Sequence, residues 1–226
     1  MKKYLLLLST TLALILAPIA SNAFTIGVSM SSNSLDTAGK EDVDSDGTTD
    51  DTKNVSDDFA VGSIFLEKTQ MGDKYGFTLG VDYIPFTADI DKRSISQSSL
   101  KATADGAAST GTNSVEGSID KHMTIYIQPG MRLGDNSMIY GTFGIVSADI
   151  NVKNSSISST DMNKTTSLDG TKMGLGIKRV SDSGFVLKLD YTDTSYDTVS
   201  FKTDNSTTAS ADLDNTAIAL SIGKQF

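Results

Sequence analysis

Residues 185–192 read FVLKLDYT, a stretch in which apolar and polar side chains alternate. Its first, third, fifth and seventh letters (F, L, L and Y) fall on one face, and V, K, D and T fall on the other. A period of two is that of a β-strand, because successive side chains of a strand point to opposite faces. The stretch therefore predicts a strand with one apolar and one largely polar face.

The same alternation recurs along the chain and predicts eight strands. It is cleanest at 75–85 (YGFTLGVDYIP), 122–130 (HMTIYIQPG) and 216–226 (TAIALSIGKQF), and weaker at 24–30 and 171–179. At 59–68 both faces are partly apolar, and we place Ile64 and Leu66 outward and Glu67 inward. The pattern at 138–150 predicts a strand but does not assign its faces.

The connections between these segments alternate in length. Long polar connections cover 31–58, 86–120, 151–170 and 194–214. Short turns lie near TQMGDK (69–74), RLGDNS (132–137) and SDSG (181–184). This alternation predicts neighbouring antiparallel strands with all four long loops at one end. It argues against a compact soluble domain, in which long structureless loops are uncommon.

The composition of the two faces indicates which solvent each face meets. The polar face is rich in Gly, Ala, Ser and Thr, which suit a crowded interior, whereas the other face carries Phe, Leu, Ile and Val with Tyr or Phe near its ends. That profile is typical of a transmembrane barrel, polar within and apolar without. Closure also removes the sheet edges that hydrocarbon cannot hydrate. We therefore predict an all-β, eight-stranded, antiparallel, up-and-down transmembrane barrel.

The first 23 residues are expected to be a cleaved signal peptide, which leaves residues 24–226 as the barrel. Lys2 and Lys3 precede an apolar run to Leu16, and the small residues up to Ala23 suit cleavage there. Of the 19 basic groups, two are lost with this leader, which leaves 17 against 28 acidic groups. So acidic a chain should repel nucleic acid. The absence of cysteine excludes disulfides and a thiol nucleophile.

The leader, the eight alternating segments and the last strand, IALSIGKQF, resemble the small bacterial outer-membrane barrels. That group includes the OmpA transmembrane domain, OmpX and the opacity-type proteins. The resemblance implies an outer-membrane location among lipids and lipopolysaccharide, periplasmic termini and extracellular long loops. It also implies an assembly signal read by the barrel-assembly machinery, formed here by Ile218, Leu220, Ile222 and Phe226. Lys224 departs from the apolar pattern of that signal.

An eight-stranded barrel has an interior that side chains can fill. The polar and charged side chains expected inside are Glu67, Asp82, Tyr126, Gln128, Lys178, Lys188 and Asp190. Isolated charges there would be unfavourable, so we expect them to pair and to plug the lumen. A narrow porin-like channel for small solutes is the alternative, and steady single-channel steps in a planar bilayer would indicate it.

A structural or surface-interaction role through the acidic outer loops is the function that the sequence favours, without catalysis or a required cofactor. The loops are rich in Ser, Thr, Asp and Asn, and we expect them to bury no core of their own. A more distant alternative is a lipid hydrolase that uses His122, the single histidine, with Thr124 two residues on. No carboxylate partner for His122 can be assigned from the sequence.

The first loop contains an aspartate pattern that resembles a calcium-binding loop. Residues 41–51 read EDVDSDGTTDD, with candidate ligands at Asp42, Asp44, Asp46, Thr48 and Asp50 and a turn at Gly47. Position 12 is Lys53 instead of the usual closing carboxylate. Either a solvated acidic loop or a weak calcium site fits this pattern, and any site should bind in the millimolar range.

Overall fold

The computed structural model describes residues 23–42, 47–49, 51–101, 108–156, 159–202 and 208–226. The expected signal peptide lies almost entirely outside these residues, so its cleavage stays a prediction. The described residues contain no helix that is long and apolar enough to cross a membrane.

The chain forms an antiparallel β-barrel with an eight-membered ring. The strands are β1 (Ala23–Asp42), β2 (Asp51–Met71), β3 (Tyr75–Tyr83), β4 (Ala88–Lys101), β5 (Ala108–Arg132), β6 (Ser137–Ser156), β7 (Ser159–Val180), β8 (Phe185–Tyr196), β9 (Val199–Lys202) and β10 (Thr208–Gln225). The ring runs β1-β2-β3-β5-β6-β7-β8-β10, and β10 pairs with β1 to close it. The predicted eight-stranded barrel is therefore confirmed, with β4 and β9 as added strands on β5 and β10.

A continuous belt of apolar side chains surrounds the lower part of the ring. It includes Val28 on β1, Phe77 on β3, Phe143 on β6 and Leu175 on β7, all at least 45% exposed. Ile64 is 47% exposed while Glu67 is fully buried, which fixes the faces of β2. On β6 the even-numbered positions, such as Tyr140, face the interior.

The prediction of four long loops is wrong for most of their length, because the strands continue through them. β1 and β2 pair up to Glu41 and Asp51, and β5 and β6 pair up to Asn113 and Ser156. These segments lack apolar alternation, but backbone pairing does not require it. Ser- and Thr-rich stretches thus extend the barrel beyond the apolar belt.

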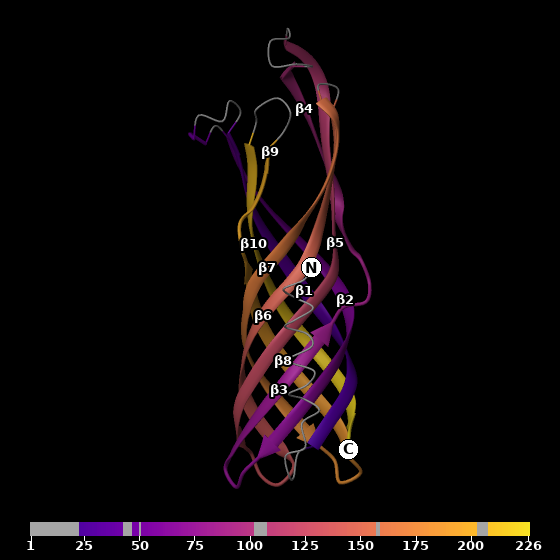
Figure 1. Ribbon diagram of the computed structural model, residues 1–226, viewed down its shortest axis with the longest axis vertical. Helices are drawn as coiled ribbons and strands as arrows, with labels where there is room; N and C mark the ends of the chain where they lie inside the picture. The colour runs from indigo at the N-terminus through magenta and orange to yellow at the C-terminus, as the bar shows by residue number, and fades with distance from the viewer. Residues whose placement is uncertain (1–22, 43–46, 50, 102–107, 157–158, 203–207) are drawn as a thin grey trace.

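Beyond this belt the ring separates into two four-stranded sheets (Figure 1). β2 pairs with β3 only as far as Ile64, and β4 then pairs with β5 rather than with β2. On the other side β7 pairs with β8 only from Gly170 onward, and β9 pairs with β10. We call the upper parts of β9, β10, β1 and β2 the first sheet, and those of β4, β5, β6 and β7 the second sheet.

The inner faces of the two sheets share a hydrophobic cluster. The first sheet contributes Leu35, Val199 and Leu213, and the second contributes Ile119, Ala148, Ile150 and Leu168, each at most 8% exposed. The expectation that these segments bury no core is therefore wrong. Each strand supplies only one or two apolar residues, and only the packing of one sheet on the other brings them together.

A β-bulge in β5 brings Ile119 into this cluster. The β5–β6 register shifts between Asp120 and Met123, and Lys121 adopts a φ of 52°. An extra residue reverses which face the following side chains occupy. Ile119 and His122 therefore both face inward, although three positions separate them, while Lys121 is exposed and bonds Asp149 at 2.7 Å.

Candidate functional site

Charged side chains meet across the inside of the barrel, in what we call the lumen network: Glu67, Lys178, Lys188 and Asp190. The Glu67 carboxylate accepts hydrogen bonds from Lys178 (3.3 Å), from Lys188 and from the Tyr126 hydroxyl (2.9 Å). Glu67, Lys178 and Lys188 are at most 4% exposed. The inward alternation of β2, β7 and β8 places these groups at one level, and the structure brings together most of the predicted lumen residues.

The ammonium group of Lys188 lies at the centre of this arrangement. Its Nζ lies 5.0 Å from the centroid of the Phe65 ring, 5.6 Å from that of Tyr126 and 5.7 Å from that of Tyr140. Asp190 lies 4.0 Å from it and accepts a hydrogen bond from Tyr140 at 2.7 Å. Aromatic faces and carboxylates together stabilise a cation that is removed from water.

Each of the three lumen aromatics lies directly opposite a glycine on a neighbouring strand. The cross-strand pairs are Gly27 with Phe65, Gly80 with Tyr126 and Gly176 with Tyr140. A Cβ atom added at any of these glycines would clash with the facing ring. These glycines lack a side chain, and each therefore leaves room for the aromatic ring of the neighbouring strand to pack over it inside the barrel.

We expect Gly80→Ala to destabilise the barrel by about 1–3 kcal/mol, the usual range for overpacking. The added methyl group would displace the Tyr126 ring and weaken its hydrogen bond to Glu67. Urea unfolding of the refolded protein, followed by circular dichroism, measures the change. The control is Gly62→Ala, whose Cβ would meet its nearest neighbour at 3.8 Å and should have little effect. Equal stability of the two variants would contradict the proposed packing of the Tyr126 ring against Gly80.

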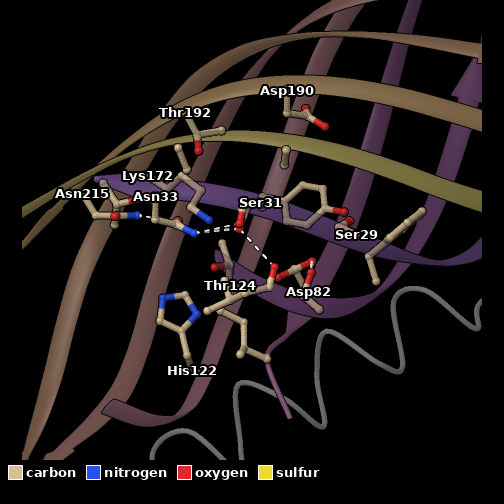
Figure 2. A pocket seen from close by; sticks show the side chains of 18 of the residues that line it. Ser29, Ser31, Asn33, Asp82, His122, Thr124, Lys172, Asp190, Thr192 and Asn215 are labelled. Carbon is tan, nitrogen blue, oxygen red and sulfur yellow. Dashed lines mark hydrogen bonds between the residues drawn. The ribbon is translucent and has the colours of Figure 1, made fainter. Parts of the chain in front are cut away.

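The lumen network separates two hollows inside the barrel. The upper one, about 130 Å³, is lined by Lys188 and Asp190 from below and by sixteen further polar side chains, of which Figure 2 labels several. The lower one, about 360 Å³, opens among the short turns and is lined by Thr69 and Lys178. No residue lines both hollows, so the network divides the interior within the described residues.

Two of the predicted lumen residues lie beside this network. Asp82 accepts a hydrogen bond from Ser63 at 2.7 Å and faces the upper cavity. Gln128 donates to Thr142 at 3.1 Å. Lys172 also faces this cavity, although the sequence reasoning did not select it. It lies on the same face as Lys178 and could have been chosen by the same alternation.

His122 lies at the outer end of the upper cavity. Its Nε2 atom hydrogen-bonds the Tyr196 hydroxyl at 3.0 Å, and its Nδ1 atom has no partner in the described part of the chain. The Thr124 hydroxyl is fully buried and also has no partner there. His122 thus contacts a tyrosine, and no described carboxylate bonds it as a triad would require.

The structure describes only part of the predicted calcium loop. The Gly47 amide donates to the Asp42 carboxylate at 2.9 Å, and Gly47 adopts a φ of 91°. Thr48 is exposed, and the residues 44, 46 and 50 lie outside the described residues. In the described ranges no three acidic or histidine side chains form a group that could hold a metal. Calcium binding stays a prediction, which calorimetric titration of wild type against Asp46→Ala would test.

The terminal strand presents its predicted assembly residues on the outer surface. Ile218, Leu220, Ile222 and Phe226 are 46–73% exposed. Phe226 and Phe24 exchange backbone hydrogen bonds of 2.8 and 3.2 Å, which closes the ring at this end. The Lys224 ammonium reaches the Ser183 carbonyl in the β7–β8 turn, so its charge lies at the end of the apolar belt.

Comparison with known proteins extends these observations. No curated protein matches the chain. The OmpT outer membrane protease of Escherichia coli is similar in fold, with 9% identity over 94% of this chain and 100% of its own, at a TM-score of 0.53. Ail, the attachment invasion locus protein of Yersinia pestis, is 18% identical over 88% of this chain and 99% of its own, at a TM-score of 0.39. The family described as "Outer membrane protein beta-barrel domain" matches residues 5–226, and the chain belongs to that family.

Proposed function

We propose that this outer-membrane barrel acts through its outer extension, as a surface-interaction protein whose lumen does not conduct. The hydrophobic cluster between the two sheets carries the proposal, since a buried core makes the extension an ordered body rather than a set of loops. An ordered surface loses less conformational entropy on binding than a flexible one. Anchorage in lipid and lipopolysaccharide, after insertion by the barrel-assembly machinery, is the context we propose for it.

The distribution of charge favours a basic partner for the first sheet. Residues 31–58, mostly on β1 and β2, carry nine acidic and two basic groups, and residues 194–214 carry four acidic groups and one basic group. By contrast, residues 151–170 of the second sheet carry two of each. Asp36 and Asp58 are both exposed on the outer face of the paired strands β1 and β2. Complementary charge of this kind steers association.

We expect an oligolysine peptide to bind the refolded protein in a salt-dependent manner. The double variant Asp36→Asn, Asp58→Asn should weaken binding about threefold or more, because each exposed charge contributes little by itself. The matched control neutralises Asp73 and Asp135, two exposed aspartates at the opposite end. Calorimetry or surface plasmon resonance measures the affinities. Equal loss in both double variants would exclude the first sheet as the binding surface.

The proposed orientation places the termini and short turns in the periplasm and the two sheets outside the cell. The chain has no cysteine, so single cysteines can report on this directly. We expect Thr49→Cys, between β1 and β2, to react with a membrane-impermeant maleimide on intact cells. Asp73→Cys, in the β2–β3 turn, should react only after the outer membrane is broken. The reverse pattern would overturn the orientation.

The division of the lumen supports a closed barrel over the narrow channel. A solute that crosses from the upper cavity to the lower hollow would have to displace Glu67 and its two lysine partners, which are buried together. Removing a buried ion from its partner is strongly unfavourable. Steady single-channel steps in a planar bilayer would favour the channel instead. Catalysis by His122 is not proposed, because its described partner is the Tyr196 hydroxyl.

A further inference from the structure

The upper cavity is bounded at both ends along the barrel axis, and an exposed residue lies in its side wall. Lys188 and Gln128 line it where it meets the lumen network, and Leu35 and Ile119 line it where it meets the hydrophobic cluster. Phe86, which is 67% exposed, also lines it. A solute would therefore enter through the wall and not along the axis.

A gap in strand pairing, which we call the side opening, flanks this wall because the two sheets separate here. Above Ile64, β2 has no ladder partner on the side away from β1, and the chain passes this gap as residues 84–87 between β3 and β4. Tyr83, an exposed aromatic residue at the end of β3, marks the outer edge of the apolar belt there. The opening thus lies where the membrane surface meets water.

Two opposite charges face this cavity without an ion-pair partner among the described residues (Figure 2). Lys172 makes no described hydrogen bond or ion pair, and Asp82 and Asp190 act on it only from beyond contact distance. Of the residues that the structure describes, only Ser63 bonds Asp82, through its hydroxyl group. Asp190, in contrast, already has Lys188 and Tyr140. Lys172 and Asp82 are therefore one cation and one anion that form no ion pair with the lumen network.

Neutral polar atoms around the same cavity also lack partners within the described ranges. Thr124 Oγ1, Thr194 Oγ1, His122 Nδ1 and Gln128 Oε1 belong to side chains that are at most 8% exposed, and Asn215 Oδ1 to a half-buried one. Buried polar atoms are hydrogen-bonded in the great majority of proteins, and each unmet one is unfavourable. These unmet atoms and the two unpaired charges leave hydrogen-bonding capacity in the cavity that water or a polar solute would satisfy.

We propose that the upper cavity binds a compact zwitterion, with its anionic group on Lys172 and its ammonium group on Asp82. Such a ligand matches both charges and leaves the site electroneutral. The cavity of about 130 Å³ is close to the 150 Å³ of an engineered cavity that holds benzene, so about six to eight non-hydrogen atoms fit. Free amino acids and the phosphoethanolamine headgroup of a lipid share this chemistry.

The test measures binding to the refolded full chain by calorimetry, with alanine, β-alanine and γ-aminobutyrate as probes in non-ionic detergent. At least one probe is expected to bind saturably, whereas pentanoate and butylamine, which lack one charge each, bind at least tenfold more weakly. A parallel sample in nanodiscs that contain phosphatidylethanolamine distinguishes the two ligands. Weaker probe binding in these nanodiscs than in detergent would show that the lipid headgroup competes and would assign the site to it. Unchanged probe binding would assign the site to the free solute. If no probe binds saturably and no headgroup competes for the site, the cavity holds water only, and the proposal is overturned.

Variants then locate the bound probe. Lys172→Met and Asp82→Asn should each weaken binding about tenfold or more, because each removes a charge-assisted hydrogen bond. Lys153→Met, an exposed lysine on β6 outside the cavity, is the control and should leave binding unchanged. The mobility shift of an unboiled sample shows that each variant has folded, and Lys172→Gln replaces Lys172→Met if the latter does not. Unchanged affinity in folded variants at both positions would overturn the assignment.

Discussion

Glu67→Gln is expected to destabilise the barrel by about 3–5 kcal/mol, the range for removing one partner of a buried ion pair. The glutamine keeps the size of the side chain and its hydrogen-bonding capacity, but it leaves Lys178 and Lys188 without their shared anion. Lys178 would retain the hydroxyl groups of Thr69 and Thr78, and Lys188 would retain the more distant Asp190. Two ammonium groups in a closed lumen would then share one carboxylate.

Urea unfolding of the refolded variants measures this change, with circular dichroism and the mobility of unboiled samples as two independent readouts. The variant that combines Glu67→Gln with Lys178→Met should recover much of the lost stability, because the remaining Lys188 still has Asp190 as its ion-pair partner. Asp212→Asn is the control for an exposed pair, since Asp212 and Lys40 interact at 3.2 Å near water. If Glu67→Gln and Asp212→Asn had equally small effects, the lumen network would not be a stabilising plug.

The sequence predicted the ring and its inner charges because both depend on one local rule. Alternation of side chains puts Glu67, Lys178 and Lys188 on the same side as the glycines, and closure then forces them together. The faces of β6 could not be assigned, because Tyr140 and Val146 lie on its inner face among small residues. The glycine opposite Tyr140 resolves this ambiguity only once the register is known.

The outer sheets could not be predicted from alternation. Their apolar residues occur one or two to a strand, as Leu35, Leu168 and Leu213 do, within Ser-, Thr- and Asp-rich stretches that look like loops. Long-range pairing brings them together, and no local pattern encodes it. The bulge at Lys121 adds a second difficulty, since it reverses the alternation between Ile119 and His122. The cavity and its side opening depend on both features.

Leu168→Ala is expected to loosen the outer sheets while the membrane-embedded ring stays closed. Leu168 is 1% exposed within the hydrophobic cluster, and truncation of such a leucine removes about 2–5 kcal/mol. In the described part of the chain the two sheets are joined to one another mainly through the ring below them and through this cluster, so the loss should appear as local opening. Limited digestion with proteinase K should cleave the variant faster in the outer segments and leave a protected core that still shifts on boiling.

Leu175→Ala is the matched control for this experiment, since Leu175 lies on the same strand but is 67% exposed on the apolar belt. It keeps the substitution and the strand constant but moves the change to the exposed face of the ring, so little increase in digestion is expected. Equal digestion of both variants would show that the cluster does not order the outer sheets. Simultaneous loss of the protected core in Leu168→Ala would show instead that the sheets and the ring unfold as one unit. Only faster cleavage confined to the outer segments agrees with an ordered binding surface supported by a separate membrane anchor.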